Sequence, residues 1–97
     1  MPTYIVLGQF TDQGIKSVKD SPKRAGAMRE MAAKVGVTVK DVYWTLGQYD
    51  VVTIVEATDD AAVTAMLLGT GALGNVRTTC MRAFNADEMS KVIGKLP

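Results

Sequence analysis

The chain has 97 residues, of which 47% are hydrophobic and 22% are charged, a composition ordinary for a single globular domain spanning residues 1–97. Eleven basic residues against ten acidic ones give a net charge of +1, so the overall charge indicates neither a nucleic-acid partner nor an anionic membrane surface. No stretch approaches the ~20 apolar residues that a membrane-spanning helix needs, and we expect a cytoplasmic protein.

Residues 3–10, TYIVLGQF, form the first predicted element, a buried strand with an aromatic residue near each end. Gly8 lies inside this strand. A glycine there is most simply a place where a helix packs against the sheet. The alternatives are a bulge or the close approach of another backbone or of a ligand.

Helical segments are expected next, between residues 11 and 36. Thr11 is typical of an N-cap, because its hydroxyl can accept a hydrogen bond from a free backbone N–H. Pro22 interrupts the helix, and Ser21 as a second N-cap, with Pro22 at the first helical position, would restart it. Gly36 is expected to end this second segment.

Residues 42–57, VYWTLGQYDVVTIVEA, have the pattern of a β-hairpin. Two runs rich in β-branched and aromatic residues flank the break Gly47–Asp50, which supplies the turn. Neither face of the two strands is cleanly polar, so we expect the sheet to be covered on both sides.

The last third of the chain predicts a helix, a strand and another helix. Thr58 is the expected N-cap of the first helix, and the glycines of residues 69–74 are expected to form the loop to a strand at residues 75–84. Asn85 and Glu88 match a capping box. The helix that follows has four apolar residues at helical spacing, Met89, Val92, Ile93 and Leu96.

This order, βαββαβ with an extra C-terminal helix, is that of the ferredoxin-like α+β fold. Its four-stranded antiparallel sheet carries the two crossover helices on one face. Because both faces of the predicted sheet have apolar or aromatic side chains, the second face needs a cover. We expect the sheet of a second copy to provide it, in a homodimer or higher homo-oligomer, with the C-terminal helix as the competing cover.

The stretch Trp44–Asp50, WTLGQYD, resembles the signature of the GYD-domain family of small bacterial and archaeal proteins. The similarity extends to Lys19–Arg24, KDSPKR, and to Gly71–Thr78, GALGNVRT, and covers essentially the whole chain. The resemblance implies the dimeric α/β-barrel class, which agrees with the strand order above. It also implies a biochemical role that is largely uncharacterised for the family.

The tip of the predicted hairpin holds the first candidate site. Tyr49 and Asp50, near Trp44, are the candidate catalytic residues, because a phenol can donate a proton and a carboxylate can accept one. The alternative is structural: Asp50 caps the turn through its own backbone, and Tyr49 packs over a strand end.

The start of the second helical segment is the second candidate site. Lys23 and Arg24 place two cations beside free backbone N–H groups, an arrangement that suits a carboxylate or phosphate ligand. The alternative is a solvated basic turn that pairs with Asp20 or with a neighbouring subunit.

Residues 69–74, GTGALG, match the string GxGxxG, but a helix precedes the string here and a strand follows it. A dinucleotide site needs the reverse order, so we reject that interpretation. We expect this loop to line a cleft with Asn75 and Arg77. Five residues are therefore the candidates for ligand binding: Trp44, Lys23, Arg24, Arg77 and Asn75.

Several chemistries lack the residues that they need. With no histidine and one cysteine, the chain offers no His-based triad and no zinc or haem site, and we expect no metal and no cofactor. Cys80, in the middle of a predicted strand, is expected to be a buried and unreactive thiol. Nucleic-acid binding lacks both a basic patch and a row of exposed aromatic residues.

Two functions from different classes remain. One is a homo-oligomeric module for small-molecule binding or for assembly. The other is a cofactor-independent enzyme, similar to the dimeric α/β-barrel monooxygenases and isomerases, that acts on a small organic substrate between sheet and helices. The module is favoured because no set of residues demands catalysis.

Overall fold

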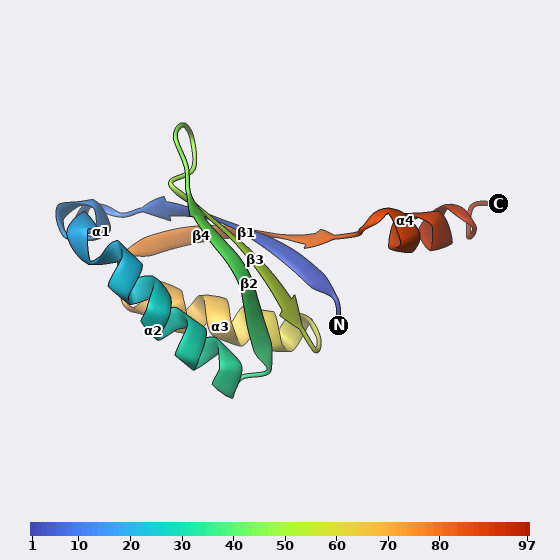
Figure 1. Cartoon of the computed structure of the whole chain (residues 1–97), viewed down its shortest axis with the longest axis horizontal. Helices are drawn as coiled ribbons and strands as arrows, with labels where there is room; N and C mark the ends of the chain where they lie inside the picture. Colours follow the sequence, from blue (N-terminus) through green and yellow to red (C-terminus); the bar gives the residue numbers. More distant parts are fainter.

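The computed structural model describes residues 1–97, and its centre is one four-stranded antiparallel sheet with the strand order β2–β3–β1–β4 (Figure 1). The strands are β1 (Thr3–Phe10), β2 (Val37–Trp44), β3 (Val51–Ala57) and β4 (Val76–Ala83). The helical segments are α1 (Asp12–Lys16), the 3-10 turn η1 (Val18–Asp20), α2 (Ser21–Lys34), α3 (Asp60–Ala72) and α4 (Ala86–Ile93). This is the predicted ferredoxin-like α+β fold, which is confirmed.

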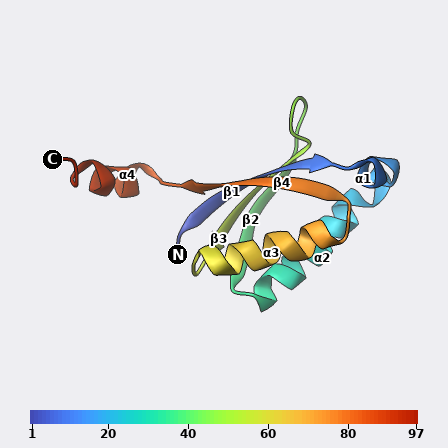
Figure 2. The ribbon, with the colours of Figure 1, turned by 180° about the vertical axis from the view of Figure 1, so that it is seen from behind.

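Helices α2 and α3 lie side by side on one face of the sheet, and no element covers the other face (Figures 1 and 2). Helix α4 continues outward from the end of β4 and stands away from the body of the domain. The radius of gyration is therefore 14.5 Å, whereas a compact chain of this length has about 12.5 Å. Helix α4, which we expected as the competing cover of the second face, does not lie on that face.

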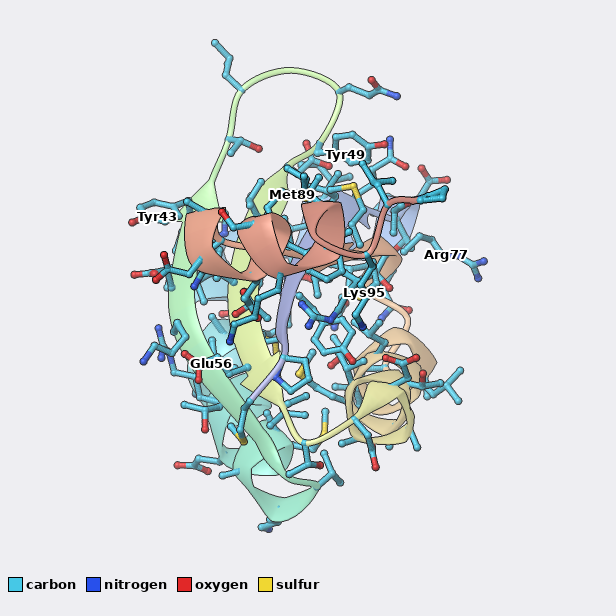
Figure 3. All side chains as sticks on the ribbon, turned by 90° about the vertical axis from the view of Figure 1, so that its right-hand side faces the viewer. Tyr43, Tyr49, Glu56, Arg77, Met89 and Lys95 are labelled. Atoms are coloured by element: carbon cyan, nitrogen blue, oxygen red, sulfur yellow. The ribbon has the colours of Figure 1, made fainter.

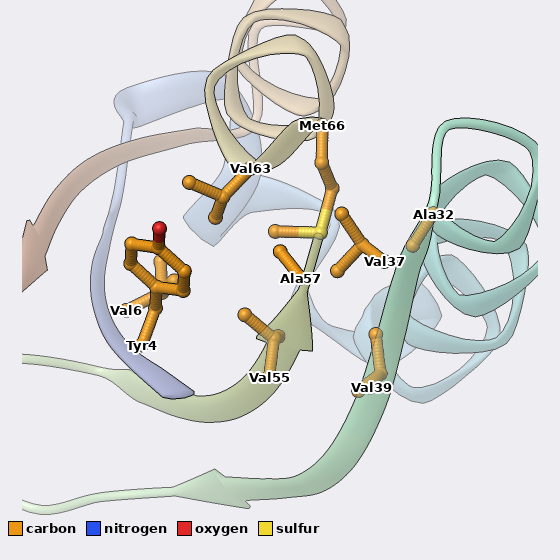
Figure 4. Packing of buried hydrophobic residues seen from close by; sticks show 9 residues of the cluster. All are labelled: Tyr4, Val6, Ala32, Val37, Val39, Val55, Ala57, Val63 and Met66. Atoms are coloured by element: carbon orange, nitrogen blue, oxygen red, sulfur yellow. The ribbon is translucent and has the colours of Figure 1, made fainter. Parts of the chain in front are cut away.

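The core lies between the sheet and the two helices (Figure 4). Alternate residues of each strand point toward the helices, and the largest fully buried side chains are those of Met66 on α3 and Val55 on β3. The buried apolar residues are Tyr4, Val6, Ala32, Val37, Val39, Val55, Ala57, Val63 and Met66. Only 13 of the 97 residues are buried, so this core is thin and leaves much apolar surface outside it.

The other side chains of the strands form an uncovered surface with an apolar centre and polar residues around it, which we call the open face. Two rows of paired residues cross it, and the apolar members are Tyr43, Val52 and Leu7 in one row and Ile54, Ile5 and Met81 in the other. Tyr43 on β2 and Arg77 on β4 mark the two edges of the sheet (Figure 3).

Three of the predicted helix boundaries are correct. Thr11 caps α1, since its hydroxyl accepts a 3.0 Å hydrogen bond from the N–H of Gly14. Asn85 and Glu88 form the predicted capping box of α4, with hydrogen bonds of 2.8 and 3.0 Å. Gly36 follows the end of α2 with a φ of +84°, a conformation that glycine adopts without strain.

Two predicted caps are wrong by one residue. Helix α2 includes Ser21 as its first residue, and the Ser21 hydroxyl accepts a hydrogen bond from a tryptophan of the sheet and does not cap the helix backbone. Asp59, not Thr58, caps α3: its carboxylate accepts a 2.9 Å hydrogen bond from the N–H of Ala62.

Two other expectations in the second half of the chain are also corrected. Helix α3 continues through Gly69 and Gly71, where we expected a loop, and Gly69 lies against Met31 of α2. Cys80 is exposed rather than buried, because β4 is an edge strand. Partial burial nevertheless raises the pKa of the Cys80 thiol, and the negative charge of Asp60 adds to this effect.

Candidate functional site

A cavity of about 390 Å³ lies between the sheet and helices α2 and α3. All four strands contribute to one wall, in two rows fixed by the strand register. The first row is Trp44, Val51, Gly8 and Thr78, and the second includes Val42, Thr53 and Val6. The opposite wall consists mainly of α2 and α3 side chains, among them Ser21, Arg24, Met28, Met31, Met66 and Leu67.

Gly8 leaves part of this space open. It stands in the first row, between Val51 and Thr78, and has no side chain to project toward the helices. A Cβ atom built there would lie 3.6 Å from the Val51 carbonyl oxygen, which is an ordinary contact. The backbone does not have a positive φ at this position either. The glycine therefore gives room to the cavity rather than relieving strain.

Trp44 and Ser21 both line the cavity, one from the sheet and the other from α2. The indole Nε1 of Trp44 donates a 2.9 Å hydrogen bond to the Oγ of Ser21, although the two residues are 23 positions apart in the sequence. Ser21 is buried, with 7% of its surface exposed, and Trp44 keeps 45% exposed. The bond ties the end of β2 to the first turn of α2 and fixes the indole at the cavity wall.

Arg24 is the one charged residue in the cavity lining. Its guanidinium donates to the carbonyl oxygen of Ser17 at 2.9 Å and to that of Gly14 at 3.4 Å, and it also contacts the Ser17 hydroxyl at 3.3 Å. Neither of the chain's two salt bridges involves Arg24, so no carboxylate oxygen lies within 4.0 Å of its guanidinium nitrogens. The cation is thus held in place by neutral acceptors and has no counter-charge.

Asn75 is held at the cavity by the segment after β1. Its carbonyl oxygen accepts a 3.0 Å hydrogen bond from the N–H of Thr11, and its side-chain oxygen accepts one from Gln13. Gly14 packs so closely that a Cβ atom there would lie 1.9 Å from the Asn75 carbonyl oxygen. A residue larger than glycine at position 14 would therefore displace the chain at this wall.

Three of the five candidate ligand-binding residues meet at the cavity: Trp44, Arg24 and Asn75. Lys23 is exposed and does not line it. Arg77 points to the opposite face of the sheet, because it pairs with Gln9, one position away from Gly8 in the alternation of the strand.

The two candidate catalytic residues lie in the hairpin loop, outside the cavity lining. The carboxylate of Asp50 accepts a 2.8 Å hydrogen bond from the N–H of Phe10, and its backbone N–H donates to the Gly8 carbonyl oxygen at 2.8 Å. The carbonyl oxygen of Tyr49 accepts a 2.6 Å hydrogen bond from the Thr45 hydroxyl. Asp50 thus joins the hairpin to the end of β1.

A second polar cluster lies near the start of α3. The hydroxyl of Tyr4 donates to the carboxylate of Asp60. This hydrogen bond, then burial and the charge of Asp60, raise the pKa of the Tyr4 phenol above its ordinary value of 10.0. The Arg82 guanidinium lies 5.7 Å from the centre of the Tyr4 ring. Nothing in the sequence pattern indicated this pair, whose members are 56 positions apart.

No group of three or more His, Cys, Asp or Glu side chains is arranged to hold a metal ion. No helix has the length and apolar character needed to cross a membrane.

The sequence model of the GYD domain matches residues 4–93. The chain belongs to the GYD-domain family. A relative from Thermus thermophilus, named glutamine synthetase and cystathionine beta-lyase binding protein, is 38% identical over 84 residues, which are 86% of this chain and 88% of the relative.

Solved structures resemble this GYD domain in fold. One from Thermus thermophilus is 28% identical, has a TM-score of 0.57, and matches 89% of this chain and 96% of its own. The feast or famine regulatory protein from M. tuberculosis has a TM-score of 0.67 at 21% identity over 89% of this chain. The GYD domain spans about half the length of that regulator, and the likeness shows the ferredoxin-like fold alone.

The two ends of the GYD signature, residues 44–50, make different contacts in this structure. Its first residue, Trp44, lines the cavity and binds Ser21, whereas its last, Asp50, connects the hairpin to β1. Leu46, between them, is fully exposed at the projecting loop.

Proposed function

We propose that this GYD-domain protein is a cytoplasmic homodimer that serves as a protein-binding assembly module, with the open faces of two copies packed together as in a dimeric α/β barrel. The observation that carries the proposal is the uncovered apolar face of the sheet. A continuous apolar surface of this kind is costly to leave in water and marks an interaction site. In a two-fold symmetric dimer the same surface of each subunit faces the other, so the open faces of two copies can cover each other.

The exposed area supports this proposal. The chain exposes 6421 Å², whereas a compact monomer of 10.4 kDa exposes about 5,400 Å². The excess is on the order of 1,000 Å², and a stable interface buries about 800 Å² per partner. The surplus surface is therefore of the size that a dimer would remove from water.

Helix α4 supports it independently. The helix and its flanking residues expose the apolar side chains of Phe84, Met89, Val92, Ile93 and Leu96. Arg82 holds the beginning of the helix through a 3.8 Å ion pair with Glu88, and its guanidinium lies 4.5 Å from the ring of Phe84. An amphipathic helix held outward from its own domain suits packing on a second copy.

The protein-binding part of the proposal rests on the relative. Its name states that it binds glutamine synthetase and cystathionine beta-lyase, and it is 38% identical to this chain. We propose that this protein likewise binds other proteins. The projecting hairpin, with Leu46 fully exposed, is a suitable contact because dimerisation through the open face leaves the loop tip free.

The test is a pair of matched substitutions examined by sedimentation velocity. Ile54→Lys places a charge in the middle of the open face, and we expect it to raise the dimer dissociation constant at least about a hundredfold. Leu68→Lys places the same charge on the exposed side of α3 and should change that constant less than about threefold. If Ile54→Lys remains as dimeric as the unchanged protein, the open face is not the interface.

A second candidate function is the binding of a small organic molecule in the cavity. Its volume lies within the range of small-molecule sites, and its walls are mostly apolar with a few polar groups. The lining has no carboxylate, phenol, thiol or imidazole, so it offers no group that exchanges protons near neutral pH. This composition supports binding more than the alternative of a cofactor-independent enzyme.

Binding without turnover predicts that a cavity ligand is recovered unchanged after prolonged incubation with the protein. The enzyme alternative predicts conversion of the ligand that depends on Tyr49 or Asp50. Conversion that is lost in a folded Asp50→Asn variant would favour the enzyme.

A further inference from the structure

We propose that the cavity binds a small apolar monocarboxylate, with its carboxylate at Arg24 and its hydrocarbon part between the sheet and helices α2 and α3. This inference rests on the second candidate function, small-molecule binding in the cavity, and is independent of the dimer.

The walls select a hydrocarbon ligand. Besides three threonines and the four residues Ser21, Arg24, Trp44 and Asn75, the lining consists of aliphatic, methionine and glycine residues. Met28, Met31 and Met66 come from the two helices, and methionine side chains adjust to ligands of different shape. The volume of about 390 Å³ has room for roughly a dozen water-sized groups. A hydrocarbon chain of roughly six to ten carbon atoms therefore fits in the cavity.

The charge of Arg24 selects a carboxylate. The guanidinium is fixed by the carbonyl oxygens of Ser17 and Gly14, which bind Nη1 and Nη2 and leave Nε without an acceptor. Neutral acceptors orient the cation but do not balance its charge. A carboxylate is the group that matches the planar donors of arginine and neutralises it at the same time.

A buried hydroxyl provides a second, separate indication of a ligand. Thr53 lines the cavity and is 5% exposed. No hydrogen bond within the chain uses its hydroxyl. Because every fully buried side-chain oxygen has a partner, the Thr53 oxygen keeps some exposed surface. Since Thr53 lines the cavity, a ligand atom there can bind this oxygen.

Ser21 completes the polar end. It lies three residues before Arg24 on α2, a spacing that puts the two side chains on the same side of the helix. Its oxygen accepts the bond from Trp44, which leaves its own proton available. The hydroxyl can thus donate to the second oxygen of a carboxylate held by Arg24, while Trp44 lies beside the ligand.

The experiment uses the fluorescence of Trp44, the single tryptophan of the chain, with isothermal calorimetry as a second readout. The probes are hexanoate, octanoate and 1-octanol. Each added methylene should raise the affinity about fourfold, so octanoate should bind at least about tenfold more tightly than hexanoate. Octanoate should also bind at least about tenfold more tightly than 1-octanol, since the alcohol lacks the charge-assisted bond.

Three variants locate the site. Arg24→Gln should weaken octanoate at least about tenfold and leave 1-octanol nearly unchanged. Gly8→Val fills the cavity and should weaken both probes; Gly8→Ala, whose Cβ meets only ordinary contacts, replaces it if the valine variant does not fold. Arg77→Gln removes an equal charge from the opposite face of the sheet and should leave both probes unchanged.

The outcomes separate the two levels of the proposal. Equal affinities for octanoate and 1-octanol, or an Arg24→Gln variant that binds octanoate normally, would overturn the carboxylate class while small-molecule binding survives. No heat and no fluorescence change with any probe up to millimolar concentration would overturn both.

Discussion

The indole Nε1 of Trp44 and the hydroxyl oxygen of Ser21 lie 2.9 Å apart, and their hydrogen bond joins the hairpin to helix α2. The first residue of the family signature is thereby connected to the basic segment at residues 19–24, which is a separate part of the same sequence resemblance. The bond also holds the tryptophan at the cavity. Two segments that the sequence shows as unrelated motifs are one structural unit.

Loss of this hydrogen bond should destabilise the domain. We expect Ser21→Ala to lower the free energy of unfolding by about 1 kcal/mol, the usual net worth of a hydrogen bond between side chains. Urea denaturation followed by circular dichroism measures it. Ser90→Ala, on the exposed side of α4, is the matched control and should not destabilise the protein. Equal stability of the two variants would show that the Trp44 contact contributes nothing.

The N-cap of α3 gives a second prediction. Asp59→Ala removes the acceptor of the Ala62 N–H and should cost about 1 kcal/mol of unfolding free energy. Thr58→Ala changes the neighbouring residue, which makes no cap bond, and should cost less than about half as much. A larger loss in Thr58→Ala than in Asp59→Ala would assign the cap to the threonine instead.

The thin core makes Met66 important for stability. Met66 is 1% exposed, and Met66→Ala should cost about 2–5 kcal/mol, because it removes buried methylene groups and enlarges an existing cavity. Met89→Ala removes the same atoms from the exposed side of α4 and should leave the unfolding of a monomeric variant unchanged. Thermal denaturation in the Ile54→Lys background, where self-association is weakened, separates the two effects.

The Tyr4–Asp60 pair predicts a loss of stability at alkaline pH. Below the ordinary phenol pKa of 10.0, Tyr4 is neutral in both the folded and the unfolded chain, and its contribution is fully present. Above that pH the unfolded chain loses the proton first, because the folded pKa is raised, so stability falls as pH increases. Urea denaturation between pH 8 and about 11 should show a steeper fall for the unchanged protein than for Tyr4→Phe.

Tyr43→Phe, compared like Tyr4→Phe in the Ile54→Lys background where self-association is weakened, is the control for this pH dependence, since Tyr43 is exposed in the single chain. It should retain the alkaline slope of the unchanged protein. If Tyr4→Phe retains that slope as well, another group is responsible for the alkaline loss.

The order of elements was predictable because each strand and helix has a strong local pattern. The strand at residues 3–10 and the capping box at Asn85 match the structure residue for residue. The end of α3 was predicted wrongly because each glycine costs a helix about 1 kcal/mol relative to alanine. In the structure Gly69 stays helical and lies against the Met31 side chain of α2. Local statistics do not include that contact.

The cavity was less predictable, because it depends on the register of the sheet. Trp44, Gly8 and Thr78 come from three separate strands and meet only when the strands are paired. The possibility of a ligand at Gly8 was visible in the sequence, as was a cation at Arg24. Neither pattern could show that Arg77 points to the other face or that Ser21 binds the tryptophan, since both facts depend on long-range pairing.

The mass of the intact protein in solution decides whether two copies pair through their open faces. Native mass spectrometry over a range of micromolar concentrations should show a species of twice the 10.4 kDa chain mass, and the Ile54→Lys variant should show the single chain. A protein that remains a 10.4 kDa monomer at every concentration would show that the open faces do not pair.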